Sequence, residues 1–223
     1  MIFDGFFIYH LIQELNQKLS KARLEKIYQT GEWTFVFIFY LNGERMQFKI
    51  DVSTHHFSMY ITEQKAEVTL NSQFLLTLKK QLEGSILDEI TQHETDRVAI
   101  FHFTTYDYID GPIPKELVFE AMGKHSNLIL TKDQIILESF KKMFFEEGRQ
   151  LIPMAHFEFF PSHKAPFHHI DFKHIESPKD IVNQYMGVSP ALASYLFETK
   201  KQISDILLKP TLDLVSNKGY VAD

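Results

Sequence analysis

The stretch Gly123-Lys124-His125-Ser126-Asn127 places four polar side chains in a row between two segments that alternate like β-strands, residues 115–122 and 128–130. One interpretation is a tight turn of type I or I′ with Lys124 in solvent, because a turn needs only glycine and polar side chains. The other is a phosphate or sugar contact made by the four polar side chains together with nearby backbone N–H groups. The residues alone leave both interpretations open.

A second candidate is the pair Asp96-Arg97, which directly precedes the apolar run of residues 98–103. Its guanidinium is always charged and presents a planar fork of donors. From the spacing alone, the pair also fits a salt bridge or an Asx turn at the entrance to a strand.

Other kinds of chemistry find little support in the sequence. The chain has no cysteine, which excludes disulfides and thiolate catalysis, and it has no GxSxG nucleophile elbow. Gly123-Lys124 does not form a P-loop, because His125 follows the lysine and a strand rather than a helix follows the turn. We therefore expect no catalytic activity and no cofactor.

Histidines are numerous, at 11, and four of them lie close together at His163, His168, His169 and His174. Neighbouring histidines can bind a metal, but such a site requires ligands on rigid elements with a supporting second layer of hydrogen bonds. This segment is irregular and contains proline. We expect surface or packing histidines here and no metal site.

The composition indicates a globular protein: 223 residues, 44% hydrophobic, are enough for one substantial core and a small appended unit. The formal net charge of −6 disfavours nucleic acid overall, so any RNA contact requires a local patch. No apolar run reaches the roughly 18 residues of a membrane span, and the start lacks the basic flank of a signal peptide. We expect a cytoplasmic protein without membrane insertion.

The first part of the chain predicts one helix, a group of strands and a second helix. Apolar residues at helical spacing predict a helix over 5–19, with Asp4 as its cap. Asn42-Gly43 is a hairpin signal between two β-type runs. The expected elements are strands over 23–29, 34–40, 46–52 and 57–61, and a helix over 74–82 that ends at Gly84.

The second part predicts a further group of strands and then a change of pattern. Strands are expected over 86–92, 98–104, 117–122, 128–130 and 135–137. A helix before each group of strands favours an α+β fold whose core is a β-sandwich of two antiparallel sheets packed face to face. After an irregular stretch, helices are expected over 180–185, 191–197 and 204–208, the first two forming a helical hairpin.

Several of these stretches resemble a known family. The segments FDGFFIYHLIQELN, ARLEKIYQ and EAMGKHSNLIL, together with Asp96-Arg97, are similar to the NFACT-N domain of the family that includes bacterial fibronectin-binding protein A and a ribosome-quality-control factor. MGVSPALASYL resembles the start of the helix-hairpin-helix region that follows in that family. The resemblance implies two domains, a sandwich over 1–172 and a helical region over 173–223 that belongs to a longer protein.

The resemblance also implies a fold similar to the N-terminal domain of formamidopyrimidine-DNA glycosylases. Those enzymes use an N-terminal proline as nucleophile beside a glutamate. Here the chain starts Met1-Ile2-Phe3-Asp4, so both groups are missing and glycosylase chemistry is not expected.

The function that the resemblance implies is binding of tRNA and of the large ribosomal subunit carrying a stalled peptidyl-tRNA, to promote C-terminal alanine tailing of the nascent chain. Residues tied to tailing in the family match Asp4, Asp96 and Arg97. The arginine can pair with phosphate and the carboxylates can read a base edge or a ribose hydroxyl. Gly123–Asn127 would supply a second RNA contact.

The alternative is an adhesin. Members of this family in streptococci and related bacteria are also described as surface proteins without an anchor that bind fibronectin or fibrinogen. That function implies a location on the cell surface by a route without a signal peptide.

Overall fold

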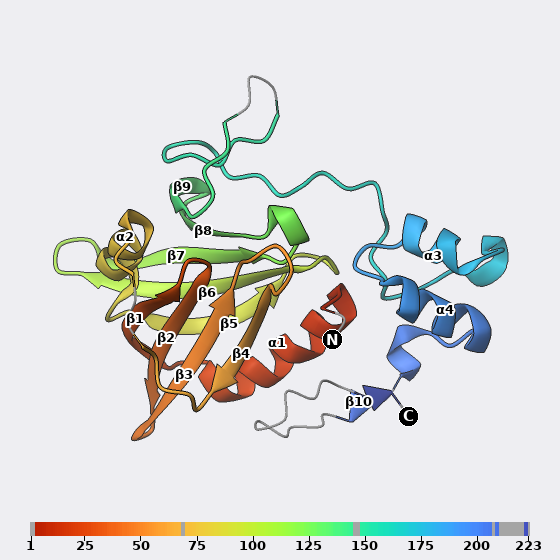
Figure 1. Cartoon of the computed structure of the whole chain (residues 1–223), viewed down its shortest axis with the longest axis horizontal. Coiled ribbons are helices and arrows are strands. Elements are labelled where there is room, and N and C mark those ends of the chain that lie inside the picture. The colour runs from red at the N-terminus through yellow and green to blue at the C-terminus, as the bar shows by residue number, and fades with distance from the viewer. Residues whose placement is uncertain (1–2, 68–69, 145–147, 207, 210–220, 223) are drawn as a thin grey trace. The chain divides into compact units, whose positions relative to one another are not determined.

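A computed structural model gives the structure of the chain and describes residues 3–67, 70–144, 148–206, 208–209 and 221–222 (Figure 1). The chain divides into two units, which we call the helical unit and the sheet unit. The helical unit comprises Met1–Leu11, Gln92–Val98 and Pro161–Asp223, and the sheet unit comprises Ile12–Thr91 and Ala99–Phe160. This division differs from the expected boundary after residue 172, because two early segments group with the C-terminal helices.

The sheet unit contains nine strands in one continuous sheet, in the order β4-β3-β2-β1-β5-β6-β7-β8-β9. Most of it is built from antiparallel neighbours that follow one another along the chain. The strands are β1 (Arg23–Gly31), β2 (Thr34–Leu41), β3 (Glu44–Asp51), β4 (Ser58–Thr62), β5 (Ile86–Gln92), β6 (Val98–Asp107), β7 (Gly111–Glu120), β8 (Asn127–Lys132) and β9 (Ile135–Ser139).

The prediction of two separate sheets is wrong, although two halves do face each other. β1 and β5 are paired antiparallel through Arg23 and Ile86, which joins the two groups of strands into one sheet. Across the core, the ring centroids of Phe48 on β3 and Phe101 on β6 lie 5.5 Å apart. A pairing this short leaves the sheet free to fold over, so apolar side chains of both halves share one interior.

Local signals in the sequence correspond well to the strands and helices. The predicted hairpin between β2 and β3 is confirmed, and Asn42 and Gly43 have φ values of 52° and 91°, as a type I′ turn requires. Helix α2 (Gln73–Leu82) begins at Ser72, whose side chain accepts a hydrogen bond from the backbone of Leu75 at 3.1 Å. It is followed by Gly84, with φ of 90°.

The helical unit contains the start of α1 (Gly5–Leu19), the connection between β5 and β6, and helices α3 (Pro178–Gln184) and α4 (Pro190–Thr199). Short elements complete it: the 3-10 turns η2 (Phe172–His174) and η3 (Ile203–Asp205), and the two-residue strands β10 (Leu208–Lys209) and β11 (Val221–Ala222). Its apolar core includes Phe6, Phe167, Ile170, Ile181, Tyr185 and Leu196. The predicted helix over 204–208 is wrong for the part described, which contains η3 and the start of β10.

Three distant backbone segments meet very closely in this unit. Gly5 donates a backbone hydrogen bond to the carbonyl of Gly187 at 2.8 Å. A Cβ atom on Gly5 would lie 2.0 Å from the Thr95 carbonyl oxygen, and one on Gly187 would lie 1.8 Å from it. Only glycine fits at these two positions, since any side chain would collide with backbone.

No helix in the described part of the chain is both long enough and apolar enough to cross a bilayer.

Candidate functional site

Asp4 acts as a helix cap. Its side chain is buried, 8% exposed, and Oδ1 accepts a hydrogen bond from the backbone N–H of Phe7 at 2.9 Å. This bond satisfies one of the donors that the first turn of α1 would otherwise leave unpaired. The predicted capping role is confirmed, and the carboxylate has little surface left for a ligand.

Asp96 and Arg97 lie in the tight connection between β5 and β6. Asp96 Oδ1 accepts from the backbone N–H of Arg97 at 2.7 Å, and the Asp96 N–H donates to the carbonyl of His93 at 3.0 Å. The two side chains form no salt bridge with each other in the described structure. The carboxylate therefore shapes the loop and does not neutralise the guanidinium.

Gln92 connects this loop to the start of α1. Its Nε2 donates to the carbonyl of Gly5 at 2.8 Å and to the carbonyl of Asp96 at 2.7 Å. One side chain thus brings the backbone next to Asp4 and the backbone of Asp96 together. Its Oε1 is buried and has no hydrogen-bond partner among the described residues, which is uncommon for a buried amide.

Thr95 fixes the same loop from the other side. Its hydroxyl donates to the carbonyl of Met186 at 3.0 Å and accepts from the N–H of Phe167 at 3.2 Å. Through Thr95, the tip of the β5–β6 connection is therefore held at two points of the C-terminal segment of the helical unit. Since the backbone on both sides of Arg97 is fixed, this side chain projects from a rigid base.

Arg97 itself is partly exposed. Within the described residues its guanidinium has no hydrogen bond and no ion pair, so its five N–H donors are available. Of the predicted residues in this unit, Arg97 is the one whose charged group remains free to bind a ligand.

The segment Gly123–Asn127 belongs to the sheet unit and links β7 to β8. It begins with a 3-10 turn, η1 (Gly123–His125), in which Gly123 has φ of 60°. Ser126 is fully buried, and its Oγ accepts from the N–H of Met122 at 2.9 Å. The hydroxyl is therefore used inside the protein to close the turn.

Asn127 is also buried, at 1% exposed, and holds the chain after β9. Its Oδ1 accepts from the N–H of Lys141 at 2.8 Å and from that of Leu128 at 2.9 Å. Its Nδ2 donates to the Lys141 carbonyl at 2.9 Å. The two bonds to Lys141 replace strand pairing that ends here, which explains why an amide stands at this position.

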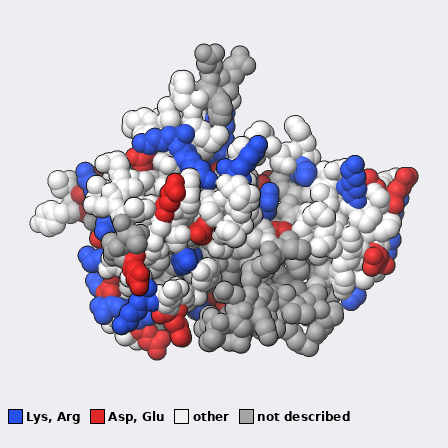
Figure 2. All heavy atoms as spheres, in the orientation of Figure 1, with Lys and Arg blue, Asp and Glu red and all other residues white. Residues whose placement is uncertain are grey.

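Lys124 and His125 are exposed, and they are the members of this segment that face outward. The His125 ring lies 6.0 Å from that of Phe160. The backbone of Lys141 is bonded to Asn127, and the Lys141 ammonium lies 4.9 Å from the centre of the Trp33 ring. Burial lowers the pKa of Lys141. Figure 2 shows lysine and arginine atoms gathered over β8, β9 and η1.

Arg149 stabilises the segment that packs against His125. It forms a two-pronged ion pair with Glu120, which is fully buried at the end of β7, and lies 4.4 Å from the centre of the Phe160 ring. A buried carboxylate requires such a partner. The pair and the ring therefore fix the segment on which His125 rests.

Sequence reasoning missed Gln92, Thr95 and Gly187, which position the Arg97 loop. The available signals were weak: a threonine directly before Asp96-Arg97 and a glycine in the turn before α4. The four histidines between residues 163 and 174 are exposed, and nowhere in the described ranges do three histidine or carboxylate side chains gather as a metal site would require.

Comparison with known proteins identifies the family. The family described as NFACT N-terminal and middle domains matches residues 4–213, so the chain belongs to it. This result confirms the resemblance drawn from the motifs.

Two curated relatives are each named "Rqc2 homolog RqcH". The protein from Bacillus subtilis strain 168 is 28% identical over 208 residues, covering 86% of this chain and 36% of the relative. The protein from Streptococcus suis strain 05ZYH33 is 31% identical over 243 aligned positions, covering 100% of this chain and 44% of the relative. The chain thus spans less than half of these relatives.

Two solved structures with the same fold are named as fibronectin-binding or fibronectin/fibrinogen-binding proteins. The N-terminal domain of fibronectin-binding protein PavA from Streptococcus pneumoniae superposes with a TM-score of 0.82 at 27% identity, over 89% of this chain and 80% of that one. The N-terminal part of the fibronectin/fibrinogen-binding protein from Streptococcus suis gives 0.86 at 26% identity, over 100% and 90%. Both support the α+β architecture described above.

Proposed function

We propose that this chain is the N-terminal portion of a ribosome quality control factor and that it binds RNA through Arg97. The family supports the biological setting, since the relatives are named as Rqc2 homologues. The single observation that carries the assignment is the unpaired guanidinium on a loop fixed by Gln92 and Thr95. A rigid, unneutralised arginine is well suited to a bidentate contact with phosphate.

Lys124 and His125 form the second contact in this proposal. Both are exposed and carry no carboxylate partner among the described residues. Ser126 and Asn127 hold their backbone in place and make no direct contact. Asp4 and Asp96 likewise act by shaping the loops, because their oxygens already accept backbone hydrogen bonds.

Binding should be weak and sensitive to salt. The net charge of −6 opposes association with RNA, so only local cations contribute. In the full-length protein, this contact would help to hold tRNA on the large ribosomal subunit during alanine tailing. The role proposed for this chain is binding.

The test is titration of fluorescently labelled tRNA into the protein at low and moderate salt. Arg97→Ala should weaken binding by about tenfold and lower the salt slope by about one. Arg97→Lys should recover part of the loss, because it keeps the charge but not the fork. The matched control is Lys179→Ala, an exposed cation in the same unit. Equal affinity of Arg97→Ala and the parent would refute the proposal.

Binding of fibronectin or fibrinogen is the second candidate. It is favoured by the names of the two structural relatives, which share the fold over nearly the whole chain. The measurement is binding of immobilised fibronectin by the folded protein and by a heat-unfolded control at physiological salt. Binding by the folded protein that survives Arg97→Ala, with no tRNA binding, would favour this candidate.

A further inference from the structure

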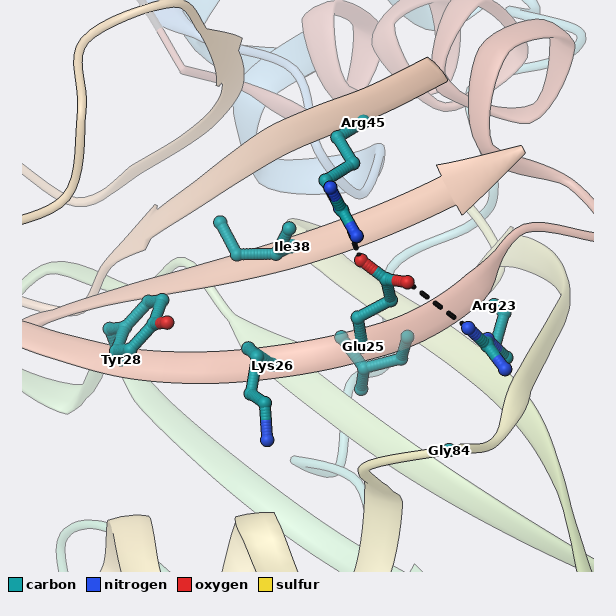
Figure 3. A pocket seen from close by; sticks show the side chains of 8 residues that line it. Arg23, Glu25, Lys26, Tyr28, Ile38, Arg45 and Gly84 are labelled. Atoms are coloured by element: carbon teal, nitrogen blue, oxygen red, sulfur yellow. Dashed lines mark hydrogen bonds and ion pairs between the residues drawn. The ribbon is translucent and has the colours of Figure 1, made fainter. Parts of the chain in front are cut away.

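The outward face of β1, β2 and β3 bears a cavity in the sheet unit that the proposed RNA contacts do not use. Its volume is about 560 Å³, and its lining includes Arg23, Glu25, Lys26, Tyr28, Ile38 and Arg45 (Figure 3). Three of these side chains are cationic and one is a carboxylate. Lys26 also lies 3.6 Å from Glu83, so three cations stand beside two carboxylates, a formal excess of one positive charge in a chain of net charge −6.

Glu25 lies between the two arginines. Arg45 Nε donates to its Oε2 at 2.6 Å, and Arg23 Nη2 donates to its Oε1 at 3.1 Å. Figure 3 shows the two guanidinium groups approaching this carboxylate from different sides. Each guanidinium donates one hydrogen bond to this carboxylate and keeps further N–H donors, the kind of donor that binds phosphate.

Neither arginine uses all of its donors in these bonds. Arg23 and Arg45 have side chains that are 55% and 69% exposed, whereas that of Glu25 is 16% exposed. Each arginine bonds Glu25 through a single nitrogen, so the other guanidinium nitrogens have no partner among the described residues. The inner carboxylate orients the guanidinium groups, and their outer edges remain open to a second anion.

The cavity also has an aromatic and aliphatic wall. Tyr28 and Ile38 lie on neighbouring strands, and Lys26 is paired in register with Ile38. The ammonium of Lys79, on α2, lies 5.8 Å from the centre of the Tyr28 ring. This cation lies over one face of the ring, so a planar base would stack on the other face, as bases do in proteins that bind single-stranded nucleic acids.

We propose that this cavity binds a nucleotide, with its phosphate on the outer edges of Arg23 and Arg45 and its base against Tyr28 and Ile38. The nucleotide is either free or part of a single-stranded RNA, since both present the same phosphate and ring. An acidic peptide would satisfy the arginines but would leave the Tyr28 wall unused. This site is independent of Arg97 and does not rest on the RNA contact proposed above.

Glu25 limits the affinity in this arrangement. The hydrogen bond from Arg45 is the main cause that lowers the pKa of the Glu25 carboxyl, so this group stays ionised at neutral pH. Its negative charge cancels part of the field that a phosphate would experience. Glu25→Gln removes that charge and keeps one acceptor oxygen, while its NH2 group can no longer accept from the second arginine. One guanidinium is thereby released for the phosphate, so nucleotide binding should strengthen.

The experiment is calorimetric titration of the whole chain with adenosine monophosphate, inorganic phosphate, single-stranded oligoadenylate and a polyglutamate peptide in parallel. Relative to the parent, Arg45→Ala should weaken adenosine monophosphate binding by about tenfold, and Glu25→Gln should tighten it by several-fold, on the order of fivefold. Tyr28→Ala should weaken the nucleotides but not inorganic phosphate. Tighter binding of oligoadenylate than of the mononucleotide identifies RNA as the source, and equal binding identifies a free nucleotide.

Two controls separate this site from the others. Lys49→Ala removes a cation from β3 outside the cavity, and Arg97→Ala removes the proposed tRNA contact; both should bind adenosine monophosphate like the parent. Thermal unfolding checks that each variant is folded. The proposal is overturned if no probe binds the parent or Glu25→Gln, if Arg45→Ala binds like the parent, or if only a polyglutamate peptide binds.

Discussion

At the scale of single residues, polar side chains of the same type serve two different purposes. Ser126 and Asn127 are buried and bonded to backbone groups, whereas Lys124 in the same segment is exposed. Asp4 caps a helix, while the guanidinium of Arg97 has no hydrogen-bond or ion-pair partner among the described residues. The chemistry of a residue therefore does not reveal its role until its burial and its partners are known.

Asn127→Ala should be strongly destabilising. The substitution leaves the N–H and carbonyl of Lys141 without the partners that they have in the parent, and each buried orphan costs roughly 1–3 kcal/mol. We expect a loss of about 3 kcal/mol in the free energy of unfolding, measured with urea.

The matched control is Lys124→Ala in the same loop, which should change stability by less than about 0.5 kcal/mol because the side chain is exposed. Similar stability of Asn127→Ala and Lys124→Ala would show that the amide does not hold the chain after β9.

At the scale of elements, local devices define where helices begin. Helix α3 starts at Ser177, and Asp180 Oδ2 accepts from the Ser177 N–H at 2.8 Å, from its hydroxyl at 2.9 Å and from the Glu176 N–H at 3.1 Å. Pro178 stands in the first turn, where its missing N–H costs nothing. These signals are short-range, which is why this helix was predictable.

The Asp180 cap should make the stability of the helical unit depend on pH. The hydrogen bond from the Ser177 hydroxyl is the first cause that lowers the pKa of the Asp180 carboxyl. A carboxyl whose pKa is lower in the folded state contributes stability above its unfolded pKa, of about 3.9, and loses it as the pH falls through the folded value. Acidification should therefore weaken α3.

The measurement compares the melting temperature of the parent with that of Asp180→Asn at neutral and at acid pH. The variant should have a lower melting temperature at neutral pH. The difference in melting temperature should disappear in acid, where the carboxyl of the parent is protonated and therefore also uncharged. Lys173→Ala, which removes an exposed cation outside α3, should track the parent throughout. A gap that persists unchanged in acid would contradict a role for the ionised form.

At the scale of the whole molecule, the helical unit is discontinuous in sequence. Its three segments are joined by packing, with the ring centroids of Phe6 and Phe167 6.1 Å apart and Thr95 bonded to Met186 and Phe167. A domain boundary after residue 172 would make the C-terminal helices a domain separate from all earlier residues. The contacts instead make them the support of residues 4–11 and 92–98.

Removing the C-terminal segment should therefore damage distant parts of the chain. A fragment ending at Phe160 lacks the partners of Gly5, Phe6 and Thr95, so it should bind the dye ANS and melt below the parent. It should also lose tRNA binding, because the Arg97 loop is no longer fixed. A chain ending at residue 172 should behave similarly, because the truncation removes Ile181 and Leu196 from the core of the helical unit. Parent-like melting of either fragment would support the sequence-based boundary.

The sequence by itself determined the elements and the family. Periodicity, the Asn42-Gly43 turn and the capping residues are properties of neighbouring residues, so they predicted α1, α2, α3, α4 and most strands within a few positions. Four ordered motifs were enough to indicate the NFACT-N domain, and the family match over residues 4–213 agrees.

The tertiary structure alone decided which polar groups remain available, how the strands join and which segments form a unit. Three interactions depend on contacts with another chain segment or with an adjacent strand: the bond of Gln92 Nε2 to Gly5, the bonds of Asn127 to Lys141 and the bond of Glu25 to Arg45. Burial and hydrogen-bond satisfaction are set by such partners, and no local pattern in the sequence encodes them.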